Sequence, residues 1–412
     1  MNRKIGITVI SALLTAIALQ ASDKTLRADY IFSGGKDGTS ISLRKLSVTD
    51  NWYGRSVNMD TAPVEGNGEI RMTDDATGKT LYLNTFSTLF QEWLTTDESK
   101  ILTKAFENSF LLPLPDAGAT ISIKLYDTRR NVICSLSHPV NPGDELLAQK
   151  QPSEVPYRYI HKGGDPKKCI DVAIVGEGYT AKERRLFFKD AGAAVESILS
   201  TEPFSSHRDD FNFIAVAPES KDSGVSVPQE GKWLDTAAGG HFDTFYIKRY
   251  LTTSDVFDVH DILQGLPYEH IVILANTEGY GGGGIYNSYT LTTAHHEMFA
   301  PVVVHEFGHS FGALADEYAY ENEDYDDPYY FPDIEPWEQN LTTQKDFSLK
   351  WKDMMDEGVP GVGLYEGGGY LLKGVWRPAE DCRMRSNKSE GFCPVCRRAI
   401  ERMIRFNTVS LF

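Results

Sequence analysis

Residues 302–318 read VVVHEFGHSFGALADEY, and this stretch decides how the second half of the chain folds. His305 and His309 are four residues apart, so on an α-helix both imidazoles project from one face, about one turn apart. Pro301 suits the first turn of such a helix, and Gly312 suits its end. The spacing therefore predicts a helix that presents two histidines to one metal ion.

Glu306 follows the first histidine by about 100° around the helix, given its 3.6-residue period. Its carboxylate can reach a metal-bound water there without being a ligand itself. The pattern HExxH is the signature of zinc peptidases. The alternative is coincidence, because five such letters arise by chance in roughly one or two of a hundred chains with this many histidines. The helical context favours the metal site, with Glu306 as the general base.

A catalytic zinc ion usually has three protein ligands and one open position, so a third ligand must follow the two histidines. In the extended metzincin motif HExxHxxGxxH, the glycine lets the chain turn back so that a third histidine reaches the metal. Here Ala315 occupies the place of that histidine, and Asp316 follows it. The sequence thus predicts a carboxylate ligand, displaced by one position.

The motif HEFGHSFGALADEY resembles the IgA-peptidase-type zinc metallopeptidase family, and the likeness covers most of the chain. The resemblance implies a β-rich N-terminal domain followed by a metzincin-like catalytic domain. It also implies that His305, His309 and Asp316 hold the zinc ion and that Glu306 is the general base. Glu317 remains the reserve ligand, or it hydrogen-bonds a ligand histidine from behind and orients it.

A metzincin-like site also needs a methionine-containing turn beneath the metal, and Met384 is the downstream methionine placed for it. The alternative is that Met384 is an ordinary core residue. The oxyanion that forms during peptide hydrolysis needs a hydrogen-bond donor besides the metal. The candidates for that donor are Tyr318, Tyr365, Tyr370 and Arg385.

The chain has five cysteines, which in an exported protein point to an oxidising compartment. We expect a structural disulfide from Cys382 to Cys393 or Cys396, joining the methionine turn to the last helix. A redox-active CPxC pair and a structural metal site are alternatives, the second lacking an evident fourth ligand. Cys134 and Cys169 either pair or remain thiols.

The chain of 412 residues, 41% hydrophobic and 24% charged, is long enough for two globular domains. Residues 1–21 combine a basic start with an apolar run and small residues, which predicts a cleaved signal peptide. We therefore expect a secreted, periplasmic or cell-surface protein without a membrane span. The net charge of −17 argues against nucleic acid or an anionic membrane as the partner.

Short alternating runs separated by turn residues predict an all-β sandwich over residues 22–150. Residues 151–412 alternate compact apolar strands with helical patterns, which predicts an α/β domain whose sheet is covered by helices on one side. The expected elements are strands at 170–175, 211–217 and 270–275, a helix from Thr180 to Ser200, and a helical segment at 242–263.

Residues 279–284 contain five glycines and precede an extended stretch at 286–290. This pattern predicts an edge strand that pairs with a substrate backbone, or else a flexible surface loop. His295 and His296 are expected at the surface or in the cleft. The acidic, tyrosine-rich residues 316–333 could hold a structural Ca²⁺ ion, with a solvated loop as the favoured alternative.

The function predicted from these features is that of a secreted zinc endopeptidase acting on a protein or peptide. One alternative is a cell-surface binding module with a vestigial metal site, which would have no need of Glu306. Another is a metal-dependent hydrolase that acts on something other than peptides. The resemblance does not make immunoglobulin the substrate, because specificity lies in cleft loops and in the N-terminal domain.

Overall fold

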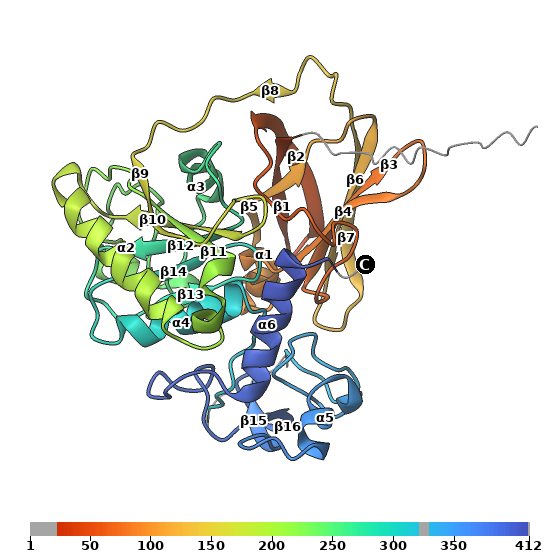
Figure 1. Ribbon diagram of the computed structural model, residues 1–412, viewed down its shortest axis with the longest axis vertical. Helices are drawn as coiled ribbons and strands as arrows, with labels where there is room; N and C mark the ends of the chain where they lie inside the picture. Colours follow the sequence, from red (N-terminus) through yellow and green to blue (C-terminus); the bar gives the residue numbers. More distant parts are fainter. Residues whose placement is uncertain (1–22, 321–328, 411–412) are drawn as a thin grey trace, which may run out of the picture.

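The computed structural model describes residues 23–320 and 329–410. The predicted signal peptide, residues 1–21, lies outside the described residues. Figure 1 shows a β-rich unit formed by the first third of the chain, an α/β unit beside it, and a smaller region below them that contains β15, β16 and α5. The long helix α6 (Pro394–Thr408) runs from this lower region back toward the β-rich unit.

The N-terminal unit is a sandwich of two four-stranded sheets, with strand orders β5-β1-β2-β8 and β4-β3-β6-β7. Alternate residues of β3 and β6 are buried, as expected for sheets with one face on a core. The predicted all-β sandwich is present. Its strands are β1 (Lys24–Gly35), β2 (Gly38–Asp50), β3 (Gly68–Asp74), β4 (Thr80–Phe86), β5 (Thr103–Pro113), β6 (Ala119–Tyr126), β7 (Val132–Val140) and β8 (Ala148–Gln149).

Between β4 and β5 the chain forms two short helical turns, α1 (Leu89–Trp93) and η1 (Asp97–Lys100). Thr88 caps α1 by accepting a hydrogen bond from the Gln91 amide at 3.2 Å. Phe90 and Trp93 are fully buried. These contacts hold α1 against the sandwich core and fix the position of Glu92 between them.

The second unit is built on a six-stranded sheet of order β13-β14-β12-β10-β11-β9. Strands β10, β11, β12 and β14 are parallel, and the edge strands β9 and β13 are antiparallel to their neighbours. β10, β11 and β12 are buried along their whole length, as parallel strands usually are. The strands are β9 (Tyr157–Lys162), β10 (Ile170–Glu177), β11 (Phe211–Val216), β12 (His270–Ala275), β13 (Gly282–Gly284) and β14 (Thr290–Thr293).

Helices lie on both faces of this sheet, so the expectation of helices on one side is wrong. α2 (Arg184–Leu199) and α4 (Phe299–Ser310) share one core, whereas α3 (Val256–Ile262) packs with Ile271 and Ile273 on the other face. The reason is that strands buried on both faces need cover on both sides.

The predicted helical segment at 242–263 is wrong for most of its length. Only α3 and the single turn η5 (Thr244–Tyr246) are helical there. Asp243, Phe245 and Tyr246 have positive φ angles of 64°, 52° and 65°, which a continuous right-handed helix does not allow.

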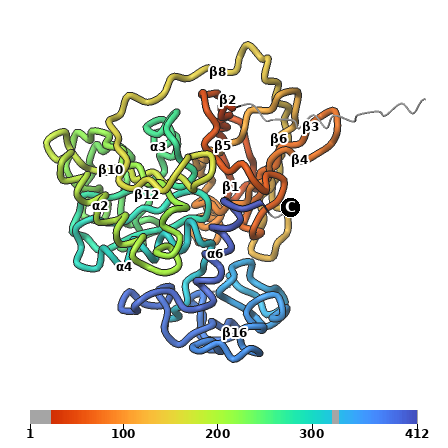
Figure 2. Tube along the Cα trace, viewed as in Figure 1, coloured from red at the N-terminus to blue at the C-terminus, as the bar shows by residue number. Residues whose placement is uncertain are grey.

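The lower region contains α5 (Lys352–Asp356) and the hairpin of β15 (Tyr365–Gly368) and β16 (Leu371–Arg377). Figure 2 shows α6 rising from this region between the other two units. At its upper end the Asn58 side-chain amide donates hydrogen bonds to the carbonyls of Phe406 and Val409. The remaining short helical turns are η2 (Ala181–Glu183), η3 (Phe204–Asp210), η4 (Pro228–Glu230) and η6 (Phe347–Leu349).

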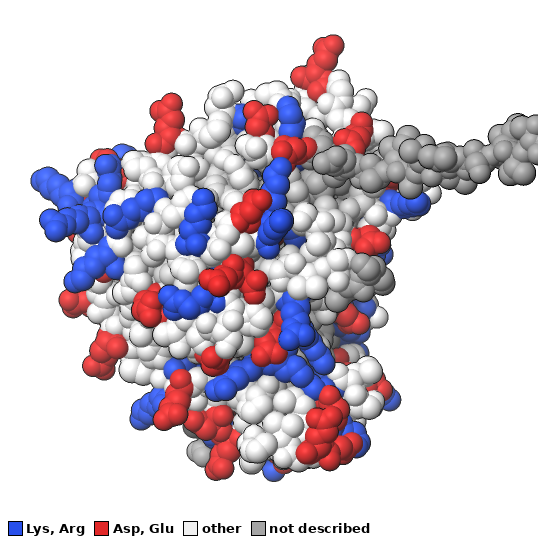
Figure 3. Space-filling view, in the orientation of Figure 1, with Lys and Arg blue, Asp and Glu red and all other residues white. Residues whose placement is uncertain are grey.

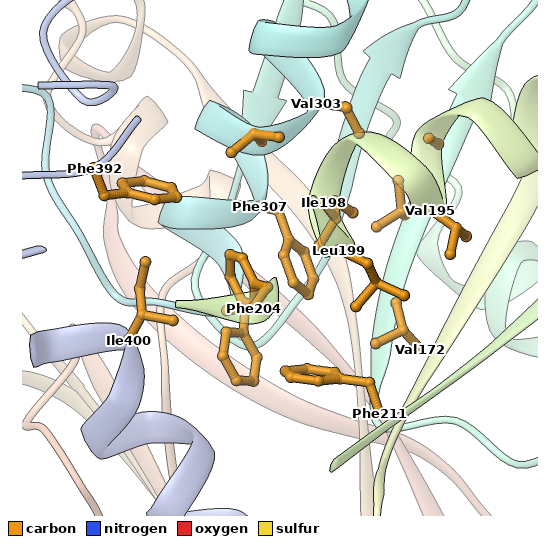
Figure 4. Packing of buried hydrophobic residues seen from close by; sticks show 14 of the residues in the cluster. Val172, Val195, Ile198, Leu199, Phe204, Phe211, Val303, Phe307, Phe392 and Ile400 are labelled. Atoms are coloured by element: carbon orange, nitrogen blue, oxygen red, sulfur yellow. The ribbon is translucent and has the colours of Figure 1, made fainter. Parts of the chain in front are cut away.

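Aromatic side chains join the sheet, the helix α4 and the segment before α6 into one core. Figure 4 shows Phe204 beside Phe307 and Phe211, with Phe392 and Ile400 close by. The ring centroid of Phe204 lies 5.4 Å from that of Phe307 and 5.8 Å from that of Phe211. Phe204 therefore fixes how α4 sits on the sheet.

On the face shown in Figure 3, acidic and basic side chains are interspersed, with Lys and Arg grouped over the region of α2. Within residues 23–320 and 329–410, no helix is long and apolar enough to cross a membrane.

The Phe204→Ala variant should lower the free energy of unfolding of the second unit by about 3–5 kcal/mol, because it leaves a cavity among four rings. Chemical denaturation followed by tryptophan fluorescence measures this change. Leu186→Ala on α2, whose side chain is 37% exposed, is the matched control and should stay within about 0.5 kcal/mol of the parent. Equal effects of the two changes would contradict the assigned core.

Candidate metal centre

Helix α4 carries the two histidines, and a sharp reversal follows it. The helix begins at Phe299, so Pro301 lies in its first turn, and it ends at Ser310. The residue that adopts the left-handed conformation after the helix is Ala313, with φ 55°, rather than Gly312. Gly312 is needed for a different reason, since a Cβ there would lie 2.7 Å from the Gly308 carbonyl oxygen.

The reversal brings Asp316 to the two histidines. Its Oδ1 lies 3.1 Å from His305 Nε2 and 3.3 Å from His309 Nε2, and the two Nε2 atoms are 3.1 Å apart. Ligands at the usual zinc bond length of about 2.0–2.1 Å in tetrahedral geometry are separated by about 3.3 Å. The three atoms therefore form one face of a tetrahedron of the size that zinc requires.

Backbone carbonyls orient both rings. His305 Nδ1 lies 2.9 Å from the Arg383 carbonyl oxygen, and His309 Nδ1 lies 2.6 Å from that of Leu314. A carbonyl oxygen can only accept, so each Nδ1 carries a proton and donates. In the neutral ring each Nε2 then offers its lone pair to the metal position.

Asp316 has an oxygen that fits a cation. Its side chain is buried, Oδ2 accepts a hydrogen bond from the Tyr370 hydroxyl, and Oδ1 faces the two imidazole Nε2 atoms. Buried carboxylate oxygens are normally paired with a donor or a positive charge. The donor set of two imidazole nitrogens and one carboxylate oxygen therefore fits a metal ion.

Glu317, the reserve ligand, points away from the histidines. It is fully buried, and its Oε1 accepts a hydrogen bond from Asn340 Nδ2 at 2.9 Å and from Cys396 Sγ at 3.0 Å. The structure thus brings Asp316 to the histidine pair, and carbonyl groups orient the rings.

The Glu306 carboxylate lies beside the metal position, with its ligand atom and those of the two histidines all within 4.8 Å of one another. Burial raises the pKa of Glu306, and the positive charges of His305, His309 and Arg249 oppose that rise. The carboxylate can therefore take up a proton more readily than an exposed glutamate can.

The glycine run packs directly against α4. A Cβ at Gly282 would lie 2.6 Å from Glu306 Oε1, and one at Gly284 would lie 2.2 Å from the Glu306 carbonyl oxygen. Any side chain at Gly284 would push the strand away from α4. The glycines are therefore required by the close approach of β13 to the Glu306 turn.

The predicted extended stretch at 286–290 is wrong, because Tyr286 and Asn287 form a turn and Thr290 starts the interior strand β14. The edge strand is β13 itself. Its outer side is partly occupied, since the Gly282 amide donates to Arg249 O at 3.3 Å and the Gly282 carbonyl accepts from the Leu251 amide at 3.5 Å. In this conformation a substrate therefore cannot pair with the full length of β13, because Gly282 is already bonded.

Sequence reasoning missed two groups that face this site. Glu92, from α1 of the N-terminal unit, accepts a hydrogen bond from the Tyr250 hydroxyl at 2.6 Å. Burial raises the pKa of Glu92 to about 7, and the charges of His309 and Asp316 act on it as well. Arg249 is the second group, with its guanidinium 5.8 Å from the ring of Tyr318. Neither residue belongs to a motif, because only the fold brings them to α4.

Of the four candidate donors to an oxyanion, two lie at the metal position. Tyr370 donates to Asp316, and the ring of Tyr318 lies 5.4 Å from that of Tyr370. The ring of Tyr365 instead lies under the Arg377 guanidinium, and the exposed Arg385 donates to the Glu380 carbonyl.

Met384 is fully buried in a turn closed by the Arg385 amide, which donates to the Cys382 carbonyl at 2.9 Å. Its sulfur packs against Gly308, where a Cβ would lie 2.8 Å away. The turn thus lies against α4 between the two histidines, and its Arg383 carbonyl holds one of them.

The expected disulfide from Cys382 to Cys393 or Cys396 is wrong, because all five cysteines are free thiols. The sulfur atoms of Cys382 and Cys396 are 3.7 Å apart, whereas a disulfide needs about 2.05 Å. Cys134 lies on β7, and the Cys169 thiol donates to the Asp209 carbonyl at 3.5 Å.

Two other predictions concerned the histidine pair before α4 and the acidic segment after it. His295 lies 2.8 Å from an Asp190 carboxylate oxygen, and His296 Nδ1 accepts a hydrogen bond from the Met298 amide. Of the acidic segment 316–333, residues 321–328 lie outside the described residues, so the predicted calcium site is outside them too.

Comparisons with known families agree with this geometry. Residues 159–361 and 359–404 match a peptidase domain, and residues 19–137 match the N-terminal domain that accompanies it. The chain is therefore a two-domain peptidase. It belongs to the IgA Peptidase M64 family, and its first part matches the Peptidase M64 N-terminus. No curated protein is similar enough to the chain to count as a match.

Metal affinity should rise with pH. Burial disfavours the charged form of His309, but Asp316 outweighs this and raises the pKa of His309 to about 9 before a metal binds. Since a metal displaces that proton, the apparent affinity should increase between about pH 6 and about pH 9 and then level off. Competition with a chromophoric chelator measures it, and an affinity independent of pH over this range would contradict the assignment.

Proposed function

We propose that this peptidase is a zinc-dependent endopeptidase with a metzincin-like catalytic domain. His305, His309 and Asp316 are the proposed ligands, and Glu306 is the proposed general base. The observation that carries the proposal is the convergence of the three donor atoms to mutual distances of 3.1–3.3 Å, with Glu306 beside them.

Two nitrogens and one carboxylate oxygen form a donor set that zinc accepts readily, and three protein ligands leave one position open for water or substrate. The chemistry that zinc supplies at such a site is polarisation of the scissile carbonyl and a lowering of the pKa of a bound water to about 7. The other parts of the reaction fall to side chains of this chain.

Glu306 is placed to take a proton from the attacking water and to pass it to the leaving amine. The Arg249 guanidinium lies 5.8 Å from the ring of Tyr318, and that ring lies 5.4 Å from the ring of Tyr370, which is bonded to Asp316. We propose that Tyr318 and Arg249 donate to the oxygen of the scissile carbonyl as it becomes negative. Tyr370 instead serves Asp316, because its hydroxyl is bonded to that carboxylate.

The metzincin-like assignment is supported by three features around α4. The helix packs on a mixed sheet, an antiparallel edge strand lies against its Glu306 turn, and Met384 fills the space behind Gly308. The basic and apolar start of the sequence supports export, so we propose that the enzyme works outside the cytoplasm.

The competing reading, a binding module with a vestigial metal site, gains no support from the site. Glu306 is retained with its carboxylate at the metal position, whereas a binding module has no use for a general base. Glu306 could serve as general base in the hydrolysis of peptides or of other substrates. Membership of a peptidase family favours peptides.

The Glu306→Gln variant should keep its zinc and lose at least about a hundredfold in peptide cleavage, because only the proton acceptor is removed. Metal analysis and cleavage of a quenched fluorescent peptide library measure the two properties. Glu297→Gln, at an exposed position shortly before α4, is the matched control and should leave both unchanged. Asp316→Ala should lose the zinc ion held by the two histidines as well as activity. Undiminished cleavage by Glu306→Gln would refute the mechanism.

A further inference from the structure

A second group of side chains of the kinds that bind metal ions lies outside the proposed catalytic site. The ligand atoms of Glu317, Cys382, Cys393 and Cys396 all lie within 4.8 Å of one another. Three of the four side chains are fully buried and Cys393 is 5% exposed. We call this group the thiol cluster. The sequence indicated that the three cysteines could bind a metal but did not indicate Glu317 as the fourth ligand, because Glu317 lies 65 residues before the first of them.

The distances in the thiol cluster suit a metal ion better than a covalent bond. Cys382 Sγ and Cys396 Sγ are 3.7 Å apart, and Cys396 Sγ is 3.0 Å from Glu317 Oε1. Sulfur ligands of tetrahedral zinc, at about 2.3 Å from the metal, are separated by about 3.8 Å. The sulfur atoms therefore already stand at the separation that a shared metal ion imposes.

Glu317 contributes an oxygen that lacks a partner among residues 23–320 and 329–410. Its Oε2 is buried without a hydrogen-bond donor from those residues, while Oε1 is held by Asn340 Nδ2 at 2.9 Å. The Asn340 amide is fixed in turn by hydrogen bonds to the amide and carbonyl of Ala315. The thiols around this carboxylate are only weak hydrogen-bond donors. A nearby positive charge would therefore stabilise it.

The start of α6 places two of the four side chains at the N-terminus of a helix. Cys393 is the N-cap of this 15-residue helix, and Cys396 lies in its first turn after Pro394. The Cys393 amide also donates to Cys382 Sγ at 3.4 Å. The partial positive charge of a helix N-terminus stabilises nearby thiolates, which are the form of cysteine that binds metal.

We propose that Glu317, Cys382, Cys393 and Cys396 bind a second zinc ion in a closed, structural site. Four protein ligands leave no open position, which is typical of structural zinc and not of catalytic zinc. Soft thiolate ligands select zinc over calcium or magnesium. Metal binding would also protect the three thiols from oxidation in an exported protein.

The second site would stabilise the parts of the chain that position the catalytic ligands. Glu317 directly follows Asp316, and Cys382 directly precedes Arg383, whose carbonyl holds His305. The Glu317 amide is bonded to the Met384 carbonyl at 2.9 Å. A metal ion in the thiol cluster therefore joins the segment after α4, the methionine turn and the start of α6.

The proposal is tested in the full-length chain with both catalytic histidines changed, His305→Ala and His309→Ala, so that only the thiol cluster can bind metal. Loaded with Co²⁺, this variant should bind about one ion per chain and show the intense near-ultraviolet sulfur-to-cobalt absorption of thiolate ligation. A variant that binds no cobalt, or binds it without this absorption, would overturn the proposal while leaving the catalytic assignment intact.

A second measurement needs no substitution at either site. X-ray absorption at the zinc edge of the wild type should show sulfur neighbours at about 2.3 Å in addition to nitrogen and oxygen neighbours at about 2.0–2.1 Å. Nitrogen and oxygen neighbours alone would overturn the proposal, even if the histidine variant failed to fold.

Thiol counting separates the metal site from a disulfide. The wild type denatured in chelator without reductant should show all five thiols, and a count of three would reveal a disulfide and overturn the proposal. Cys396→Ser should reduce the zinc content of the wild type from about two ions to about one. Cys169→Ser, a cysteine outside the cluster, is the matched control and should keep both ions.

Discussion

The structure depends on one electrostatic constraint, which is that two imidazole nitrogens and a carboxylate oxygen must be held within 3.3 Å of one another. Such an arrangement is unfavourable without a positive charge among the three atoms. Several contacts hold it in place. The carbonyls of Leu314 and Arg383 orient the rings, and Tyr370 holds the far oxygen of Asp316. These contacts come from α4, from the reversal after it, and from the lower region, so the candidate site requires the whole second unit to fold.

Sequence alone was sufficient where the chemistry is local. The histidine spacing predicted the helix and its metal-facing side, and the compact apolar runs predicted β10, β11 and β12 to within two residues. It was insufficient where distant segments meet. Whether Asp316 or Glu317 turns toward the histidines depends on Ala313 adopting a positive φ and on Asn340 binding the neighbouring carboxylate. Neither property can be read from the residues themselves.

The same limit explains the other differences. Cysteine spacing suggested a disulfide, but Glu317 inserts among the thiols, and its position depends on the reversal after α4. The glycine run suggested an edge strand at 286–290, whereas the edge strand is β13 within the glycine run itself. The glycines are required there by the close approach of Glu306, which lies on another element. Glu92 was missed because a residue of the N-terminal unit approaches the metal position only once α1 packs against the Tyr250 segment. The N-terminal unit therefore contributes a partly buried carboxylate, hydrogen-bonded to Tyr250, as well as a scaffold.

The most direct test of the central claim is anomalous X-ray diffraction from crystals of the zinc-loaded protein, recorded on both sides of the zinc absorption edge. The account predicts an anomalous peak within bonding distance of His305 Nε2, His309 Nε2 and Asp316 Oδ1, about 2.0–2.2 Å from each. No peak at that position, or a peak bonded to both histidines and to Glu317 in place of Asp316, would contradict it.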